Sequence, residues 1–521
     1  MFKYIHKHID ANLIKAAFAF ALIHCFLFNS SIFVYKLSYI HSSLVVAILE
    51  IIKDIIYSII TLFVIFFGLT IHRVVFIVSS IILFVASALA SYYLFFFSVS
   101  PSGSMMHSVF GTHLNEVYEL LSIKLILWLV FSFSICVYSI KYFKIQNTKL
   151  FFTKLLASIC LLITISNIIT PKYSFMKTSF PIQYLHNSYI YFFGASNEYA
   201  REELAKKFSF TDVSDGSVIG VFVIGEAARY DHFGINGYQR DTTPNLSKNE
   251  NVVSYKTASC ASFTHVSLPC MLSRYGEKDI DLVQSETGLL SVLTHLGFET
   301  IFMGTQSIVK HYKNRSGGTF YDEVKFHMIP GGSIAILPNS HDGNLLPHLE
   351  QNIKNNKKQF IVLHTTGSHW NYAARHPEEF AKFTPALQPG IKGDASSYST
   401  MQLVNSYDNS ILYTDFFLSS VINNLKDKNA FLIYSSDHGE SLGENGRLTH
   451  GVDEYVLEQR IVPLIIWFSD SYKSANPKKW ASIKSLASKE ISHDYLFHTI
   501  LDCLNIDSDA IDKSLSLCQN Y

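Results

Sequence analysis

Residues 430–446 read AFLIYSSDHGESLGENG, and this stretch decides the fold. Ala430–Ser435 is a short apolar run of the kind that forms a strand buried in a parallel sheet. It is followed by Ser436-Asp437-His438 and, after a glycine-containing loop, by His450. A carboxylate and an imidazole at a strand end can turn toward one cation, and the glycines let the backbone pass close to it. The stretch therefore predicts a metal site at the edge of an α/β sheet.

Four more apolar runs of strand length occur in the C-terminal part, with helical patterns between several of them. Together they predict an α/β layer fold of the doubly covered type, with buried parallel strands. Besides 430–435, the expected strands are Val218–Ile224, Thr300–Met303, Phe360–His364 and Val462–Trp467. In open parallel sheets, reactive groups collect outside the carboxyl ends of the strands. Glu226 and His369 follow two of these ends closely.

Glu226 supplies a second carboxylate at the same predicted edge. Taken alone, it also fits an acid in the first turn of a helix, where the helix dipole stabilises it. With Asp437 and His438 it makes two carboxylates and one nitrogen, a set that suits zinc and also accepts manganese. We therefore expect these three side chains to bind zinc.

The segment Cys260–Cys270 offers a group for such a metal to activate, namely Thr264. A threonine hydroxyl is a poor nucleophile at neutral pH, but zinc coordination and a place at a helix N-terminus both favour its alkoxide. We predict that Thr264 is the nucleophile, held rigid by a disulfide between the two cysteines. A single threonine is more often a cap or a surface residue, so this prediction depends on the neighbouring motifs.

His369 and His450 form a second group of nitrogens near the same edge. We expect them to bind non-bridging phosphate oxygens, to assist protonation of a leaving alcohol, or to hold a second zinc ion. Weaker candidates for a direct role are His265, His364 and Lys310.

The N-terminal part is built of apolar runs, and the whole chain has only 16% charged residues. Five segments are long and apolar enough to cross a bilayer. They are Leu13–Tyr35, Leu44–Leu69, Val74–Phe97, Leu125–Ile140 and Leu150–Ile169. The second also carries Glu50, Lys53 and Asp54, which are costly in hydrocarbon and are expected to face other helices or the interface.

Basic residues predict the orientation of these segments. They cluster on one face, at Lys3, Lys7, Arg73, Lys141, Lys144 and Lys149, which should be the cytoplasmic face. Five crossings then put the C-terminal domain outside the inner membrane, in the periplasm of a Gram-negative cell. A cleaved signal peptide is disfavoured because the first segment is long, lacks an obvious small-residue cleavage site and is followed by further spans.

The composition divides the chain into a transmembrane domain at 1–170, a connector at 171–215 and a catalytic domain at 216–521. The connector contains an amphipathic stretch, Asn197–Phe208, that is expected to lie along the membrane surface. The formal net charge of zero gives no electrostatic argument for a nucleic acid partner, and we exclude one.

The seven cysteines fall into two groups. Three lie in predicted spans and are most simply small apolar residues: Cys25, Cys136 and Cys160. The other four lie outside the membrane, where disulfides form. Cys260 with Cys270 and Cys503 with Cys518 are the natural local pairs.

These motifs resemble the phosphoethanolamine transferases of Gram-negative envelopes, which include lipid A modifying enzymes and the mobile colistin resistance proteins. That family belongs to the alkaline phosphatase and sulfatase superfamily. The resemblance covers nearly the whole chain, and its most specific motifs are Cys-x3-Thr-x5-Cys at Cys260–Cys270 and the run Ser436–Gly446 with His450-Gly451.

The resemblance implies a zinc site made of Glu226, Thr264, Asp437 and His438, with one tightly bound zinc and a second during turnover left open. It also implies that His369 and His450 match the histidines that bind the substrate or the second metal.

The implied reaction moves phosphoethanolamine from phosphatidylethanolamine to a lipopolysaccharide acceptor, which is lipid A, Kdo or a core sugar, through a phospho-threonine. The loop between the third and fourth spans resembles the donor-lipid loop of the family, with Thr112 and Glu116 at matching places and Ser108 where asparagine is usual. Lys310 lies close to the place of a family lysine. Resistance to cationic peptides follows only if lipid A phosphates are the target.

Three other functions share features with this sequence. A glycerol-phosphate transferase of the lipoteichoic acid synthase type shares five spans and a metal-activated threonine, but the cystine-bracketed Thr264 and the Gly-Glu-Asn-Gly run argue against it. A sulfatase is disfavoured because Cys270–Arg274 lacks the proline of the formylglycine motif. A non-catalytic membrane sensor or assembly protein with a dead phosphatase-like domain stays open.

Overall fold

The computed structural model describes residues 10–39, 44–111, 114–171, 177–193, 202–214, 216–283, 285–306, 325–328, 341–354, 357–391 and 393–519. The chain forms two compact units. Unit 1 comprises Met1–Phe110 and Leu121–Ala195, and unit 2 comprises Gly111–Leu120 and Ser196–Tyr521. Of the segment between the third and fourth spans, only residues 111–120 therefore belong to unit 2.

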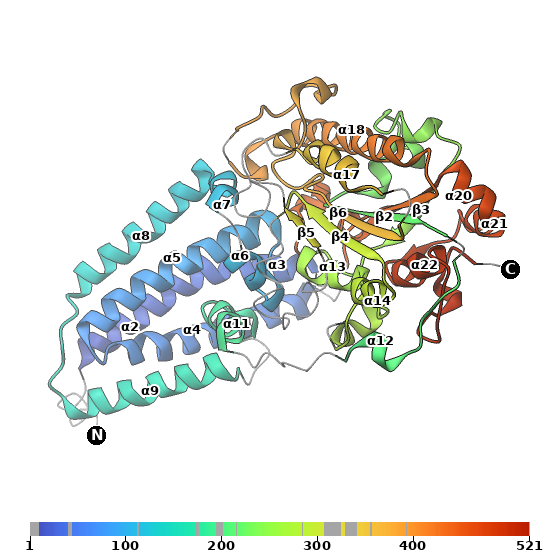
Figure 1. Cartoon of the computed structure of the whole chain (residues 1–521). Coiled ribbons are helices and arrows are strands. Elements are labelled where there is room, and N and C mark those ends of the chain that lie inside the picture. Colours follow the sequence, from blue (N-terminus) through green and yellow to red (C-terminus); the bar gives the residue numbers. More distant parts are fainter. Residues whose placement is uncertain are drawn as a thin grey trace. The chain divides into compact units, whose positions relative to one another are not determined.

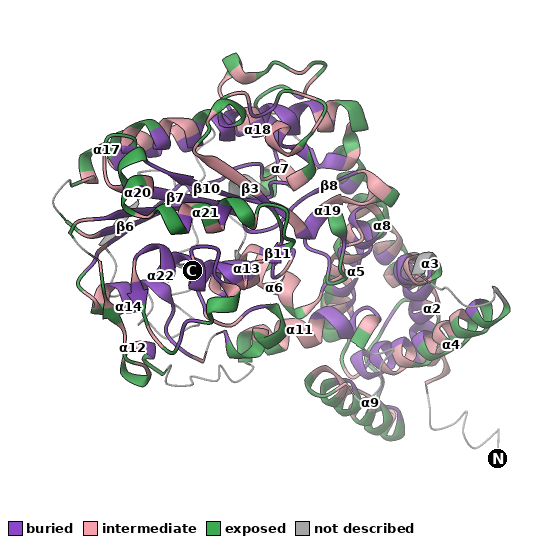
Figure 2. Ribbon diagram, turned by 90° about the vertical axis from the view of Figure 1, so that its right-hand side faces the viewer, coloured by how far each residue is buried: buried purple, intermediate pink, exposed green. Residues whose placement is uncertain are grey.

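Unit 1 contains five helical segments that are long and apolar enough to cross a membrane, as the sequence predicted. The first is continuous through α2 (Ala11–His24), the π-helical turn η1 (Cys25–Asn29) and α3 (Ser30–Tyr39); the others are α4 (Leu44–Leu69), α5 (Arg73–Phe97), α8 (Ile123–Phe143) and α9 (Phe151–Ile169). Shorter helices are α6 (Gly103–Gly111) and α11 (Ile182–Phe193). Much of the surface of α4 and α9 is exposed (Figure 2), which suits contact with lipid.

Several polar groups inside unit 1 are paired with one another. His24 Nε2 lies 2.8 Å from Ser87 Oγ, which lies 3.0 Å from the Tyr184 hydroxyl. Among the charges of the second span, Asp54 forms a 2.6 Å ion pair with Lys36 of the first span. Pairing of this kind lowers the cost of placing polar groups in hydrocarbon.

Unit 2 is built on an eight-stranded sheet with the order β11-β3-β10-β7-β2-β6-β4-β5. The strands are β2 (Ile219–Gly225), β3 (Val252–Ala258), β4 (Glu299–Gly304), β5 (Lys325–Met328), β6 (Gln359–His364), β7 (Ala430–Ser436), β10 (Ile461–Phe468) and β11 (Ile491–Ser492). Its four central strands β7, β2, β6 and β4 are parallel, and their side chains are almost all buried.

Helices cover both faces of this sheet (Figures 1 and 2). One face carries α17 (Leu346–Asn352) and α18 (Thr400–Leu425), and the other carries α13 (Thr264–Met271), α14 (Leu289–His295) and α22 (Tyr495–Cys503). The smaller elements of unit 2 are α7 (Leu114–Leu120), α12 (Leu204–Lys207), α19 (Leu457–Arg460), α20 (Asp470–Ala475), α21 (Pro477–Ser485), β1 (Thr211–Asp212), β8 (Ser441–Leu442), β9 (Leu448–Thr449) and β12 (Ile506–Asp507). The predicted α/β fold with two covered faces is confirmed.

One strand runs in the direction opposite to the prediction. Val462–Trp467 was expected to be parallel, but β10 is antiparallel to both β7 and β3. The chain passes from β7 into β10 through a loop and the four-residue helix α19, without a helix that crosses back over the sheet. Since a parallel neighbour needs such a crossover, β10 must return in the opposite direction.

The longest described helix of the predicted connector is α11 at Ile182–Phe193. Of the predicted amphipathic stretch, residues 197–201 lie outside the described residues. Leu204–Lys207 forms α12, and Leu204 is buried, with its backbone N–H donating to Thr287 Oγ1 of unit 2.

Both predicted disulfides are present, Cys260–Cys270 and Cys503–Cys518. Cys25 and Cys136 are free and buried among the membrane helices, as expected of small apolar residues. The first disulfide spans the start and most of α13, so it restrains the segment that presents Thr264.

Gly225 ends β2 immediately before Glu226, and a Cβ atom built there would lie 2.5 Å from the Tyr434 hydroxyl. We expect Gly225→Ala to destabilise unit 2 by about 1–3 kcal/mol, because Tyr434 is fully buried and has no room to move. The unfolding temperature of the full-length protein in detergent measures this. Gly103→Ala is the control, since no atom lies within 4 Å of its added methyl group; equal unfolding temperatures for the two variants would contradict the expectation.

Candidate active site

The carboxyl ends of β2 and β7 bring the first three candidate residues together. The two strands are parallel neighbours, and Gly225 pairs in register with Ser436. The residues that follow the two strands, Glu226 after β2 and Asp437 after β7, therefore leave the sheet side by side, and His438 comes next. Thr264 comes from a third place, the first residue of α13.

The four side chains meet within hydrogen-bond distance. Thr264 Oγ1 lies 3.1 Å from Glu226 Oε2 and 3.2 Å from His438 Nε2. His438 Nε2 lies 3.1 Å from Glu226 Oε1 and 3.5 Å from Asp437 Oδ2. Glu226, Asp437 and His438 are completely buried, whereas Thr264 is half-buried. The hydroxyl thus lies on the more open side of a closed, charged cluster.

Two buried carboxylate oxygens of this cluster, Glu226 Oε1 and Asp437 Oδ2, accept no hydrogen bond. An ionised carboxylate buried in this way is costly unless a cation compensates it. The His438 ring is oriented for metal binding, since its Nδ1–H donates to the Gly439 carbonyl at 2.9 Å and its Nε2 faces the carboxylates. Two carboxylates, one imidazole and one hydroxyl fit a tetrahedral zinc ion.

The electrostatics of the cluster without a metal ion support this fit. Burial and the charge of Glu226 raise the pKa of Asp437 to about 7. Burial would lower the pKa of His438, but the charges of Asp437 and Glu226 outweigh it and raise the pKa to about 10. The buried carboxylates thus favour a positive charge beside them, which a bound cation would also supply.

His369 and His450 lie beside the cluster. Their rings are 5.3 Å apart, and the His450 ring is 4.1 Å from that of His438. Ligand atoms of Glu226, His369 and His450 lie within 4.8 Å of one another, so these residues form a second potential metal group that shares Glu226.

Each of these two histidines is oriented by a neighbour through its Nδ1 atom. His369 Nδ1 donates to the Trp370 carbonyl at 2.6 Å, and His450 Nδ1 lies 2.6 Å from Glu440 Oε2. The other oxygen of Glu440 accepts a 2.6 Å hydrogen bond from the Tyr372 hydroxyl. Burial and the neighbouring His438 lower the pKa of His450. Nε2 is therefore the nitrogen through which each ring can act.

Sequence reasoning missed Gln306 and Glu440. Gln306 Nε2 donates to Glu226 Oε2 at 2.7 Å and to the Thr365 carbonyl at 3.1 Å, and so holds the Glu226 side chain. Gln306 comes two residues after β4, so the strand-end argument applied to Glu226 would also have found it. Glu440 lies within the quoted 430–446 stretch.

Two of the weaker candidates, His364 and His265, lie outside the cluster. His364 is buried on β6 against Phe302, and burial lowers its pKa to about 4, which keeps it neutral. His265 is half-buried with its ring near Phe263. Lys310 and Thr112 lie outside the described residues, as does the side chain of Glu116.

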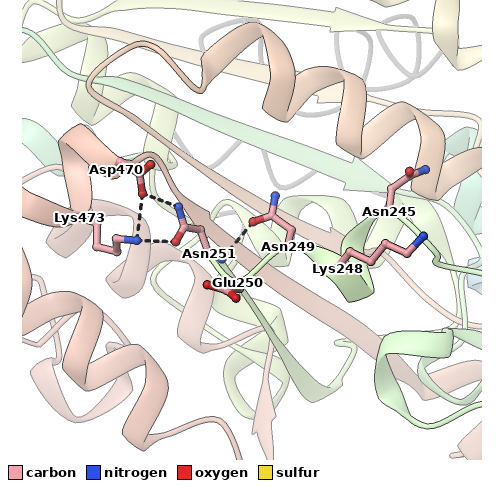
Figure 3. A pocket seen from close by; sticks show the side chains of 7 residues that line it. All are labelled: Asn245, Lys248, Asn249, Glu250, Asn251, Asp470 and Lys473. Carbon is pink, nitrogen blue, oxygen red and sulfur yellow. Dashed lines mark hydrogen bonds and ion pairs between the residues drawn. The ribbon is translucent and has the colours of Figure 1, made fainter.

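A polar hollow occurs at the other edge of the sheet (Figure 3), where β3 begins and β10 ends. Its lining residues are Asn245, Lys248, Asn249, Glu250, Asn251, Asp470 and Lys473. Asn251 bridges Asp470 and Lys473, so these side chains are bonded to one another. This edge faces away from the carboxyl ends of β2 and β7, and the hollow is not the active site.

Comparison with known families agrees with the fold. Residues 219–506 match the family model described as Sulfatase, and residues 59–193 match the one described as Phosphoethanolamine transferase EptA/EptB. The chain belongs to the sulfatase family.

The chain is also similar to individual phosphoethanolamine transferases. The chain is 37% identical over 318 residues to the Kdo(2)-lipid A phosphoethanolamine 7''-transferase of Escherichia coli K12; the match covers 58% of this chain and 54% of that protein, so it spans about half the length of the curated relative. The structure is similar to the integral membrane lipooligosaccharide phosphoethanolamine transferase A of Neisseria meningitidis, with a TM-score of 0.75, 25% identity and 98% of both chains covered. The periplasmic domain of Escherichia coli EptC, in complex with Zn, shares the fold of unit 2, with a TM-score of 0.53, 23% identity, and 60% and 89% of the chains covered.

The five spans and the similarity to an integral membrane protein along nearly the whole chain establish where the protein lies. It is a multi-pass protein of the bacterial inner membrane, and its sulfatase-like domain is periplasmic.

We expect the purified full-length protein to bind one zinc ion tightly after removal of metal by a chelator and addition of zinc. Asp437→Asn should weaken zinc binding by at least about tenfold, because it removes a charged ligand. Zinc occupancy should also fall as the pH falls, because the carboxylates and His438 bind zinc only when deprotonated. Elemental analysis measures both effects. Asp470→Asn, on the exposed helix α20, is the matched control, and equal zinc content in the two variants would contradict the assignment.

Proposed function

We propose that this chain transfers phosphoethanolamine from phosphatidylethanolamine to a lipopolysaccharide acceptor through a covalent intermediate on Thr264. The observation that carries the proposal is the half-buried Thr264 hydroxyl, 3.1 Å from Glu226 and 3.2 Å from His438. The name of the Escherichia coli relative supports both the transferred group and lipid A with its Kdo sugars as the kind of acceptor.

The surroundings of Thr264 favour its ionised form. Thr264 is the first residue of α13, where the partial positive charge of the helix N-terminus stabilises an alkoxide. Glu226, Thr264, Asp437 and His438 would hold the zinc ion. When bound, zinc supplies positive charge that lowers the pKa of the hydroxyl and offsets the charge of the phosphoryl oxygens.

The reaction has two displacements at phosphorus. First, Thr264 Oγ1 attacks the phosphorus of phosphatidylethanolamine, the bond from phosphorus to the glycerol oxygen breaks, and diacylglycerol leaves after gaining a proton. Phosphoethanolamine is then esterified to Thr264. Next, an oxygen of the acceptor attacks the phosphorus and loses its proton, the bond to Thr264 breaks, and the threonine hydroxyl is restored.

His369 and His450 hold the phosphoryl oxygens and move protons in this scheme. Glu440 accepts the Nδ1–H of His450, which directs Nε2 toward the cluster. Because the pKa of His450 is lowered, its Nε2 can take a proton from an attacking hydroxyl and return it to a leaving oxygen. The Trp370 carbonyl orients His369 in the same way.

The alternative sulfatase activity is disfavoured by the disulfide. Sulfatase chemistry of the formylglycine type requires a free cysteine that is then oxidised, and Cys270 is bonded to Cys260. No specific contact in the described residues favours the glycerol-phosphate transferase or the non-catalytic alternative, and the two experiments below distinguish them from the proposed function.

Thr264→Ala should abolish the covalent intermediate, because it removes the attacking oxygen. Intact-mass analysis of the protein incubated with phosphatidylethanolamine and no acceptor should detect one phosphoethanolamine group on the wild type. Thr264→Ser, which keeps a hydroxyl at the same place, is the control and should form the adduct. An adduct that survives in Thr264→Ala would refute the proposed nucleophile.

Mass spectrometry of envelope glycolipids identifies the acceptor. Cells expressing the wild type should gain phosphoethanolamine on lipid A, Kdo or core sugar, and cells expressing Thr264→Ala should not. A gain of glycerol phosphate would support the alternative transferase, and identical glycolipids in both strains would support a non-catalytic role.

A further inference from the structure

The short helix α7 (Leu114–Leu120) follows the third span and precedes the fourth span along the chain. It lies between α6 and the span α8, yet it belongs to unit 2. Only Leu121 and Ser122 separate it from α8, so α7 stays within about 10 Å of that span. Val117 and Tyr118 are exposed on it, 40% and 59% respectively, which suits contact with lipid.

The next residue of α7, Glu119, contacts the segment that carries His369. Glu119 Oε2 lies 3.1 Å from Arg375 Nη2, and the Glu119 carbonyl accepts a hydrogen bond from the Trp370 indole at 3.4 Å. The Arg375 side chain is only 3% exposed, whereas that of Glu119 is 24% exposed. A buried guanidinium needs a compensating charge, and Glu119 is the carboxylate paired with it among the described residues.

Arg375 also fixes the backbone around His369. Its Nε donates to the His369 carbonyl at 2.9 Å, and its Nη2 donates to the Trp370 carbonyl at 2.7 Å. The Trp370 carbonyl also accepts the Nδ1–H of His369. The Arg375 guanidinium therefore contacts α7 and also holds the backbone carbonyls that fix the position and the ring orientation of His369.

The opposite side of the same segment is held by a buried anion, Asp342. Its Oδ1 accepts from the Thr366 N–H at 2.8 Å, and its Oδ2 accepts from the Gly367 N–H at 3.0 Å. Gly367 lies so close to Glu226 that a Cβ atom would be 2.7 Å from the Glu226 carbonyl oxygen. Asp342 thus holds the start of the segment between β6 and Arg375, at Thr366 and Gly367. The end of the segment, around His369, depends on Arg375 and Glu119.

We propose that Glu119 and Arg375 are positioning residues that couple the seating of α7 on the catalytic unit to the placement of His369. A lipid donor that approaches along the membrane surface would contact α7. When α7 is docked on the catalytic unit, the Glu119–Arg375 ion pair holds Arg375 in place, and Arg375 in turn holds His369. The inference rests on the proposed function in that the donor is a membrane phospholipid.

Substitutions of Glu119 and of Arg375 should have different effects on the two kinds of substrate. Glu119→Gln removes only the charge on α7 and leaves both carbonyl contacts of Arg375. It should raise KM for phosphatidylethanolamine in vesicles at least about fivefold, and it should slow turnover of a water-soluble chromogenic ester of phosphoethanolamine by a smaller factor, about two- to threefold, because the His369 segment is loosened. Arg375→Met removes the carbonyl contacts as well and should slow both substrates. Glu119→Asp, which keeps the charge, should recover part of the affinity for the lipid.

The control is Glu378→Gln, an exposed carboxylate close in sequence to Arg375. Zinc content and unfolding temperature should match the wild type in both glutamine variants, which excludes misfolding. A KM for the lipid in Glu119→Gln equal to that of Glu378→Gln would overturn the proposal, and so would an equal loss on lipid and soluble substrates.

Hydrogen–deuterium exchange tests the coupling without turnover. Backbone amides of 114–120 and 369–375 should both exchange faster in Glu119→Gln than in Glu378→Gln. Faster exchange in 114–120 alone, or in neither, would overturn the coupling. If the wild type fails to use phosphatidylethanolamine, the proposed function fails, while the exchange result still decides whether α7 and the His369 segment are joined.

Discussion

The parallel pairing of β2 with β7 is the constraint on which the rest of the site depends. Because Gly225 pairs with Ser436, the residues that follow bring Glu226 against Asp437 and His438. A slip of one residue would turn one set of side chains to the other face of the sheet. The buried sheet fixes this register. Burying the two carboxylates of Glu226 and Asp437 costs desolvation free energy, and a cation bound between them would compensate it.

Around this fixed edge, less regular segments bring the groups that react or move. The disulfide Cys260–Cys270 and the start of α13 present Thr264 to the carboxylates, whereas Glu440 and Arg375 orient His450 and the His369 segment. In the proposed mechanism, the rigid strand ends would provide the ligands for a metal ion, and the loops would provide the groups that contact the phosphoryl group and the lipid. This division is common in α/β enzymes, where a scaffold carries functional loops.

Much of this arrangement could be predicted from the sequence, because short apolar runs followed by polar residues are a local pattern. The strand ends at Glu226 and Asp437, the two disulfides and the five spans are features of this kind. The direction of β10 could not be predicted, since it depends on how the chain returns after β7. Nor could the contact of Glu119 with Arg375, which joins residues 256 positions apart and has no local signature.

Anomalous diffraction at the zinc absorption edge, from crystals of the full-length protein grown with zinc, tests the proposed metal site directly. A zinc ion at this site should give one strong peak between Glu226, Thr264, Asp437 and His438, about 2.0–2.2 Å from their oxygen and nitrogen atoms. A fully loaded protein with no peak among these four side chains, or with its only zinc elsewhere, would contradict the proposed metal site.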